Sequence, residues 1–329
     1  MKKAIVTGGA GFIGSHLVDR LLKENCHVIV LDNFSNGSLK NLESAMKDPL
    51  LKIEKADVAD RKAIERFFCD VDAVYHCAAL ADIVPSIEQP LEYFRSNVNG
   101  TLQVMECARL HHVKNVVYIA SSSCYGIPDQ YPTLEDAPIS PQYPYALTKF
   151  LGEQIALHWG RVYKININSL RLFNVYGPRA RTRGTYGAVF KVFMPQKIHG
   201  KPFTVVGDGT QTRDFTYVSD VVEAIWQLSR SDLRNEVMNV GSGRTVSVNT
   251  LVQLLGGGPV VHVPKRPGEP NSTFADISKI KKLLGWQPRV SIEEGIKQLL
   301  KNINDWKDAP VWTPEGIESA TREWFQRLS

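Results

Sequence analysis

Apolar runs alternate with amphipathic stretches along the first half of the chain. The apolar runs, rich in Val and Ile, cover residues 4–6, 27–31, 73–76 and 116–120, and helical stretches cover 15–23, 61–68, 98–110 and 145–159. Short uninterrupted apolar runs between amphipathic stretches favour strands buried on both faces, as in a parallel sheet covered by helices. The pattern predicts an α/β fold built on a doubly wound parallel sheet.

The pattern becomes less regular after residue 178. Arg- and Gly-rich turns precede a helical stretch at about residues 188–199, and prolines interrupt residues 263–270. We predict a first domain at residues 1–177 and a smaller mixed α/β domain at residues 178–329. Within the second part, residues 214–240 are predicted to return to the sheet of the first.

Composition narrows the class of protein. The 329 residues are 43% hydrophobic, enough for a sizeable core, and no apolar run approaches the roughly 20 residues of a membrane helix. The start lacks a signal peptide, so we expect a cytoplasmic protein. Lys and Arg are spread along the chain despite a net charge of +5, so nucleic acid is not the expected partner. Five cysteines without metal spacing predict reduced thiols and no metal site.

A glycine-rich segment joins the first predicted strand to the first predicted helix. It includes Gly8, Gly11 and Gly14, and Asp32 follows 18 residues later at the end of the second strand. Small residues let backbone N–H groups and the helix N-terminus approach a pyrophosphate. Asp32 would accept hydrogen bonds from the adenosine ribose and repel a 2′-phosphate, although a helix-capping or turn aspartate is the alternative. The segment predicts a Rossmann unit that binds NAD.

Tyr145 and Lys149 are four residues apart, which places them on one face of a helix. A neighbouring ammonium, with the positive nicotinamide ring, would lower the pKa of the tyrosine toward that of a general base. Such pairs are also common on helix surfaces. The strand at 116–120, however, ends in Ser121, Ser122 and Ser123 at the carboxyl edge of the sheet, where such folds bind ligands. We predict that a hydroxyl there shares the substrate proton with Tyr145.

With these features, the chain resembles the extended short-chain dehydrogenase/reductase family, in particular its NAD-dependent nucleotide-sugar epimerases and dehydratases. The resemblance spans nearly the whole chain. The motifs that carry it are residues 7–14 (TGGAGFIG), 56–58 (ADV), 76–79 (HCAA), 97–101 (NVNGT), 121–126 (SSSCYG), Tyr145 with Lys149, 170–178 (LRLFNVYGP), 213–218 (RDFTYV) and 266–269 (RPGE).

The resemblance implies a role for each matching residue. Ser121 and Tyr145 would be catalytic, and Lys149 would also bind the nicotinamide ribose. The residues expected to contact the cofactor are Gly8, Gly11, Phe12, Ile13, Gly14, Asp32, Asn33, Asp57, Val58, Ala78, Ala79, Asn97, Tyr145, Lys149 and Phe173. Those expected to contact the substrate are Ser122, Ser123, Asn174, Ala188, Val189, Thr204, Arg213, Arg266, Glu269 and Thr273.

Arg213 and Arg266 are expected, with Asn174, to hold the diphosphate of a nucleoside-diphosphate sugar, and Glu269 its ribose. Guanidinium groups suit phosphate oxygens because they donate two parallel hydrogen bonds. Each arginine also has an ordinary explanation. Arg213 could pair with Asp214, and Arg266 could be a solvated loop charge.

The residues after Ser121 bear on the reaction. Family members that dehydrate the sugar typically have an Asp-Glu pair there, and those that decarboxylate a sugar acid usually have a Glu. Ser122 and Ser123 cannot do proton chemistry near neutral pH, which favours epimerisation at C4 through a 4-keto sugar, with NAD retained between turnovers. A 4,6-dehydratase, an epimerase for another carbon or nucleotide, and a non-catalytic NAD-binding protein are the alternatives.

The sugar and the assembly are implied only by resemblance. The position that bounds the sugar pocket near C2 is Thr273, a small residue that leaves room for UDP-N-acetylglucosamine as well as UDP-glucose and UDP-glucuronate. Uracil is the base usual in the family. A homodimer through the helices at 98–110 and 145–159 is likewise the family's usual arrangement.

Overall fold

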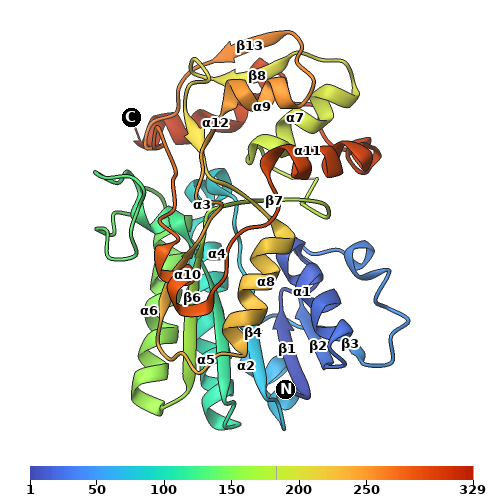
Figure 1. Ribbon diagram of the computed structural model, residues 1–329, viewed down its shortest axis with the longest axis vertical. Helices are drawn as coiled ribbons and strands as arrows, with labels where there is room; N and C mark the ends of the chain where they lie inside the picture. The colour runs from blue at the N-terminus through green and yellow to red at the C-terminus, as the bar shows by residue number, and fades with distance from the viewer. Residues whose placement is uncertain (183, 329) are drawn as a thin grey trace.

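The structure, a computed structural model, describes residues 1–182 and 184–328 and has two lobes (Figure 1). The lower lobe in that view holds a large sheet with helices on both faces. The upper lobe holds short strand pairs and several helices, among them the last helix of the chain. No helix in the described part of the chain is long and apolar enough to cross a bilayer.

The large sheet has seven strands in the order β11-β6-β5-β4-β1-β2-β3, all parallel. Their bounds are β1 Lys3–Thr7, β2 His27–Asp32, β3 Leu51–Lys55, β4 Ala73–His76, β5 Asn115–Ser121, β6 Asn166–Leu172 and β11 Val237–Val240. The chain builds outward from β1 to β3, then resumes at β4 on the other side of β1. That reversal is the point where open α/β sheets bind ligands at the carboxyl ends of their strands.

Both faces of the sheet are buried, because alternate residues of each strand enter different apolar layers. In β1, Ala4 and Val6 join the layer beneath α1 (Phe12–Lys23) and α8 (Val218–Ser229), whereas Ile5 joins the opposite layer. The opposite layer is covered by α2 (Arg61–Ile64), α5 (Gly100–Leu110) and α6 (Pro144–Tyr163). The predicted doubly wound parallel sheet is confirmed.

The remaining elements form the upper lobe and the connections to it. The helices are α3 Ile83–Glu88, α4 Pro90–Tyr93, α7 Val189–Ile198, α9 Val248–Leu254, α10 Ser278–Leu284, α11 Ile292–Lys301 and α12 Pro314–Leu328. The strand pairs are β7 Asn174–Tyr176 with β10 Phe215–Tyr217, β8 Phe203–Val206 with β13 Val260–Val263, and β9 Thr212–Arg213 with β12 Val246–Ser247. Of these elements, α10 packs against β11 of the large sheet in the lower lobe (Figure 1). The upper lobe is the smaller mixed α/β part that the sequence predicts.

Three strands of the large sheet, β3, β6 and β11, lie outside the predicted apolar runs. β3 is an edge strand in which charged residues alternate with Leu51 and Ile53, and β6 buries Asn168, Ser169 and Arg171. Only part of residues 214–240 returns to the sheet. β11 joins it and α8 covers it, but β10 pairs with β7 outside it.

Candidate functional site

The glycine loop has the geometry of a phosphate-binding turn. Gly8 follows β1 with φ +66°, a conformation that favours glycine, and a Cβ on Gly14 would collide with the carbonyl oxygen of Gly8. Helix α1 begins at Phe12, so its free backbone N–H groups lie at the loop. The loop lines a cleft at the carboxyl edge of the sheet. A helix N-terminus at such a cleft favours an anionic group.

Asp32 lies at the end of β2 and lines the same cleft. Its Oδ2 accepts a hydrogen bond from the Ala10 N–H at 3.0 Å, and its Oδ1 accepts one from the Phe34 N–H at 2.8 Å. Burial raises the pKa of the carboxyl, and these two bonds partly offset the rise. Asp32 therefore does stabilise a turn, as the alternative proposed. Each carboxylate oxygen has a second lone pair, so it can also accept a ribose hydroxyl.

Most of the residues predicted to contact the cofactor line this cleft, and a few do not. Those that line it are Gly8, Gly11, Phe12, Ile13, Gly14, Asp32, Asn33, Val58, Ala78 and Ala79. Asp57 instead pairs with Arg95 at 2.7 Å, and Asn97 donates to the Leu80 carbonyl and to Thr148. Phe173 packs against Tyr125. The apolar walls, small glycine loop and buried acid together fit a dinucleotide with unphosphorylated ribose.

Tyr145 lies in the first turn of α6, next to the end of β5. Its hydroxyl lies close enough to Ser121 for that residue to lower the pKa of the phenol, and Ser121 Oγ is 2.8 Å from Ser123 Oγ. Ser121 also accepts a hydrogen bond from the Ser123 N–H and so caps the short helical turn Ser122–Tyr125. Ser121 thus lies beside Tyr145 at the edge of the sheet, which is the position that the predicted sharing of a substrate proton requires.

Burial dominates the electrostatics of Tyr145 in the protein by itself. It raises the pKa of the phenol, the interaction with Ser121 lowers that pKa by less, and the net direction is upward. The Lys149 ammonium does not turn to the phenol: it donates to the Ile119 carbonyl at 2.5 Å and lies over the Tyr118 ring. Burial lowers the pKa of Lys149 to about 8. The predicted fall in the tyrosine pKa depends on the positive nicotinamide ring as well as on Lys149, so it stays a prediction for the protein with NAD bound; in the protein by itself, desolvation of a phenolate outweighs the groups that stabilise it.

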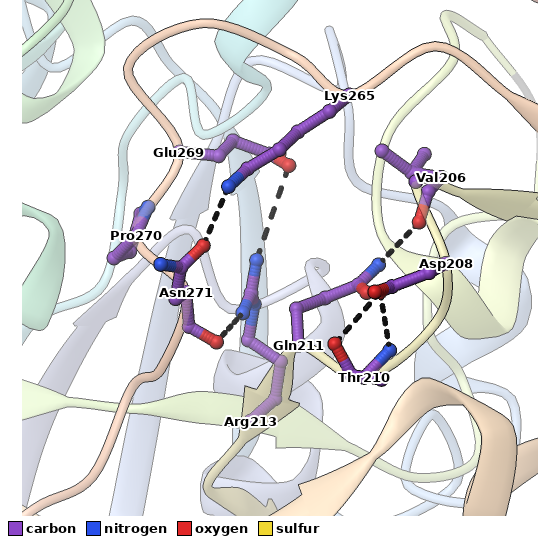
Figure 2. A pocket seen from close by; sticks show the side chains of 10 residues that line it. Val206, Asp208, Thr210, Gln211, Arg213, Lys265, Glu269, Pro270 and Asn271 are labelled. Atoms are coloured by element: carbon purple, nitrogen blue, oxygen red, sulfur yellow. Dashed lines mark hydrogen bonds and ion pairs between the residues drawn. The ribbon is translucent and has the colours of Figure 1, made fainter.

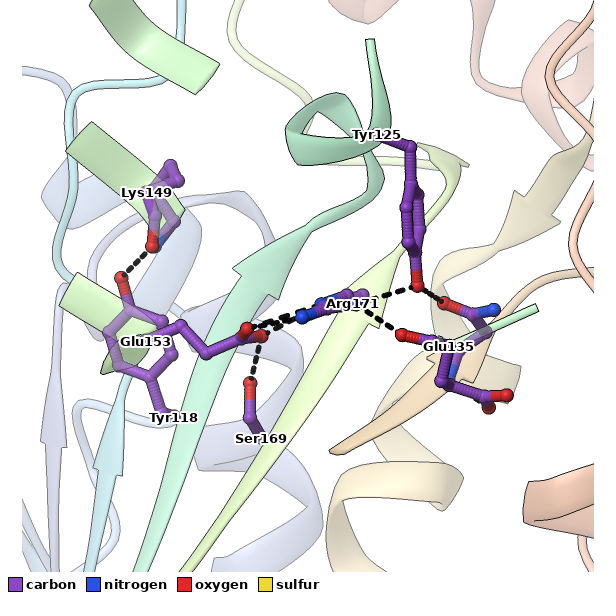
Figure 3. A network of polar contacts seen from close by, with 8 residues as sticks. Tyr118, Tyr125, Glu135, Lys149, Glu153, Ser169 and Arg171 are labelled. Carbon is purple, nitrogen blue, oxygen red and sulfur yellow. Dashed lines mark hydrogen bonds and ion pairs between the residues drawn. The ribbon is translucent and has the colours of Figure 1, made fainter. Parts of the chain in front are cut away.

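A buried polar network, not predicted from the sequence, holds α6 in place (Figure 3). Arg171 on β6 donates to both carboxylate oxygens of Glu153 on α6, at 2.6 Å and 3.0 Å. Its other amino group donates to the Tyr125 hydroxyl and to the Glu135 carbonyl, each at 2.9 Å. The network therefore joins the helix that carries Tyr145 to the turn that follows Ser121.

Arg213 does not pair with its neighbour Asp214. The Asp214 carboxylate accepts from the Ser242 and Ala275 N–H groups at 2.6 Å and 3.1 Å. Arg213 lies instead 3.9 Å from Glu269, and its side chain is 15% exposed. Burial lowers the pKa of the arginine. The guanidinium is thus partly desolvated and directed toward the loop that carries the second predicted arginine.

Arg266 is not a solvated loop charge, since its side chain is 13% exposed. It pairs with Glu269 at 3.3 Å, and its guanidinium lies 5.1 Å from the ring centre of Tyr186 and 5.3 Å from that of Trp324. The Trp324 indole, from the last helix, donates to the Pro267 carbonyl at 2.8 Å. Two aromatic rings and a carboxylate therefore fix this guanidinium in one orientation.

Arg213 and Glu269 line a second pocket, between the β8–β9 connection and the loop that follows β13 (Figure 2). The other residues that line it are Val206, Gly207, Asp208, Thr210, Gln211, Lys265, Pro270 and Asn271. None of these eight belongs to the predicted site. Lys265 donates to Asn271 at 2.7 Å, and Gln211 donates to the Val206 carbonyl at 2.8 Å. The pocket is polar and lies beside the two arginines.

The other predicted substrate contacts are dispersed. Thr273 donates to the exposed Asn174 at 2.7 Å, and Ala188 lines the first cleft. Val189 begins α7. Thr204 is buried and exchanges two hydrogen bonds with Gln196, at 2.8 Å and 3.2 Å, so its polar groups are already satisfied within the lobe.

The structure also brings three charged residues to the first cleft that the sequence pattern does not single out. Asp82, Arg181 and Lys191 come from three separate segments and all line it. Arg181 pairs with Asp82 at 2.8 Å, and Lys191 lies 4.0 Å from the same carboxylate. The charge of Asp82 is one cause of the raised pKa of Tyr145, after burial, so this cluster lies near Tyr145.

Known proteins resemble the chain over most of its length. The profile of the NAD dependent epimerase/dehydratase family matches residues 4–241. A putative UDP-glucose 4-epimerase of Methanocaldococcus jannaschii is 37% identical over 310 residues, which are 91% of this chain and 99% of that protein.

Two solved structures share the fold and more than 30% of the sequence. UDP-glucose 4-epimerase of Thermotoga maritima with UDP-glucose has a TM-score of 0.86 and 34% identity, covering 92% of this chain and 99% of that one. UDP-glucuronic acid 4-epimerase of Bacillus cereus with UDP-glucuronic acid and NAD has a TM-score of 0.85 and 32% identity, with the same coverage.

Proposed function

The chain belongs to the NAD dependent epimerase/dehydratase family, and we propose that it inverts the configuration at C4 of a UDP-sugar through a transient 4-keto sugar. The observation that carries the proposal is the position of Tyr145 beside Ser121, close enough for Ser121 to lower the pKa of the phenol, in a segment whose next residues, Ser122 and Ser123, have no carboxylate. Such a site can move one proton at one hydroxyl. It lacks the acid and base pair that expulsion of a second hydroxyl requires.

NAD is the cofactor, and the cleft at the glycine loop is where this chain would hold it. Gly8 to Gly14 would take the pyrophosphate and Asp32 the adenosine ribose. Lys149 lies on the same helical face as Tyr145 and is proposed to bind the nicotinamide ribose. When bound, NAD supplies reversible hydride transfer at C4 of the sugar.

Tyr145 is proposed to take the proton from the C4 hydroxyl while the C4–H bond is broken. Ser121 shares that proton, since its hydroxyl both donates and accepts. Burial keeps the phenol protonated in the protein by itself, so the phenolate has to be stabilised by positive charge that arrives with the bound groups. After the 4-keto sugar turns over, Tyr145 returns the proton to the C4 oxygen.

The nucleotide end of the substrate is proposed to bind at Arg213 and Arg266, which both lie beside Glu269. Arg213 and Arg266 would contact the diphosphate, with Asn174 nearby and Glu269 at the ribose. Arg266 is stacked between two rings and is therefore rigid. A keto sugar can rotate within the site only if the diphosphate is held firmly and the sugar itself makes few fixed contacts.

Dehydration is the alternative that shares this machinery. Among the described residues, the structure brings one carboxylate to the cleft close to Tyr145 that the sequence did not predict, that of Asp82. This carboxylate is paired with Arg181 at 2.8 Å. It is therefore engaged in an ion pair, and the site does not hold the acid and base that loss of the 6-hydroxyl needs. The arrangement favours epimerisation.

We also propose a homodimer formed through α5 and α6. Large apolar side chains on these helices are exposed, namely Leu110, Leu147, Val162 and Tyr163. A second copy would remove them from water. Light scattering coupled to gel filtration distinguishes a 36.8 kDa monomer from a particle of twice that mass.

The test of the function is direct. Purified protein, without added NAD, is incubated with UDP-glucose, UDP-N-acetylglucosamine and UDP-glucuronate deuterated at C4, and products are followed by NMR. The proposal expects a C4 epimer that keeps its deuterium, since the hydride leaves and returns within one site. A 4-keto-6-deoxy product with no C4 epimer would identify a dehydratase. GDP-, CDP- and dTDP-sugars in parallel test the preference for uracil.

A further inference from the structure

Lys191 is a buried cation without a hydrogen-bond partner. It lies on α7, its side chain is 6% exposed, and its Nζ makes no hydrogen bond to any residue that the structure describes. Its only ion pair among those residues is with Asp82, whose Oδ1 is 4.0 Å away, beyond hydrogen-bonding distance. An ammonium has three donors, and burying it without acceptors is costly. The position therefore implies an acceptor that binds in the cleft.

The cluster around Lys191 is placed for contact with the sugar. Lys191, Asp82 and Arg181 all line the cleft that holds the glycine loop. Asp82 immediately precedes α3, and its charge acts on Tyr145 and on Tyr93, which places the cluster beside the catalytic phenol. A group attached close to C4 of the sugar would be within its reach.

The charge of the cluster indicates what that group is. Arg181 and Lys191 contribute two positive charges, and Asp82 contributes one negative charge that is already paired with Arg181 at 2.8 Å. One positive charge thus remains uncompensated in a largely desolvated place. The diphosphate does not explain it, because Arg213 and Arg266, on the second pocket and its loop, are assigned to that group.

We propose that Lys191, assisted by Arg181, binds a carboxylate on the sugar, so that the preferred substrate is a UDP-hexuronate that carries its carboxylate on C5. The proposal rests on the proposed C4 epimerisation. C5 is bonded to C4, so a carboxylate on C5 lies next to the carbon whose hydroxyl is proposed to give its proton to Tyr145. A hydroxymethyl group at the same position could accept a hydrogen bond but would leave the positive charge unbalanced.

The experiment compares kcat/KM for UDP-glucuronate with kcat/KM for UDP-glucose and UDP-N-acetylglucosamine. In the unmodified protein we expect UDP-glucuronate to be favoured at least about 10-fold, the effect of one charge-assisted hydrogen bond. Lys191→Met keeps the length of the side chain and removes its charge. It should lower the ratio of uronate to neutral sugar by about 10- to 100-fold.

Two further variants keep the test decisive. Lys197→Met changes a lysine on the same helix that does not line the cleft, and it should leave the ratio unchanged. Lys191→Arg keeps the charge and should keep the preference for the uronate, even if Lys191→Met does not fold.

The proposal is overturned if the unmodified protein epimerises the neutral sugars as well as or better than UDP-glucuronate. It is also overturned if Lys191→Met slows all substrates by the same factor. In both cases C4 epimerisation itself stands. Failure to form a C4 epimer from any UDP-sugar would instead refute the proposed function together with this inference.

Discussion

Replacing Arg171 with methionine removes the cation from the network that ties α6 to the sheet. The Arg171 side chain is 6% exposed and that of Glu153 is 1% exposed. In the variant, Glu153 keeps the hydroxyl of Ser169 at 2.9 Å and loses the three hydrogen bonds that Arg171 donates to it. The Tyr125 hydroxyl and the Glu135 carbonyl lose a donor as well.

Removing one partner of a buried ion pair costs about 3–5 kcal/mol, because the other charge stays desolvated. Total stability of a domain is only about 5–15 kcal/mol, so we expect the free energy of unfolding to fall by a large fraction. The double variant Glu153→Leu with Arg171→Met has no unpaired charge. It should therefore recover to within about 1–2 kcal/mol of the unmodified protein, or exceed it.

Urea unfolding followed by tryptophan fluorescence measures these differences, provided that the dependence on urea has the same slope in each variant. Arg161→Met, at the exposed end of the same helix, is the control and should change stability by less than about 0.5 kcal/mol. The reasoning is refuted if the free energy of unfolding of Arg171→Met lies within about 1 kcal/mol of that of the unmodified protein, which is the net contribution of one ordinary hydrogen bond. It is equally refuted if the double variant is no more stable than Arg171→Met.

Three other outcomes are expected. Tyr145→Phe should bind NAD and UDP normally but lose about 10²- to 10⁴-fold in kcat, the usual contribution of a general base, and unchanged turnover would show that another group takes the proton. Folding lowers the pKa of Lys149 from 10.5 to about 8. Between those two pH values the unfolded chain binds more protons than the folded protein, so the free energy of unfolding rises with pH. Thermal melts of nucleotide-free Lys149→Met should lack this rise. Arg266→Lys keeps the charge but loses the planar guanidinium that lies over Tyr186 and Trp324. It should raise KM for the UDP-sugar about 10-fold or more, measured from initial rates by NMR.

Local signals predicted which residues gather at the cleft beside the glycine loop. The spacing of Gly8, Gly11 and Gly14 and the position of Asp32 depend on one turn between neighbouring elements, and ten of the predicted cofactor contacts line the cleft. Four of the strands buried on both faces, β1, β2, β4 and β5, were equally readable, because each contains a short run of apolar residues. Asp57, Asn97 and Phe173 were assigned by resemblance alone, and the structure does not place them on that cleft.

Pairings between distant residues could not be read from the sequence. β6 buries Arg171 and Ser169, so it has no apolar run, and the reason for those polar residues is Glu153 on the preceding helix. Arg266 has the same appearance in the sequence as a solvated loop charge. Only the approach of Trp324, 58 residues further along the chain, shows that it is held.

The sequence by itself determined the parallel sheet, the dinucleotide loop and the chemical types at the catalytic positions, since each follows from residues that are close together along the chain. The tertiary structure alone decided how these groups are charged and oriented. It raised the pKa of Tyr145 by burying it, turned Lys149 toward a carbonyl, and left the ammonium of Lys191 in the cleft without a hydrogen-bond partner among the described residues. Desolvation depends on everything that surrounds a group, and the surroundings of a side chain exist only once the chain has folded.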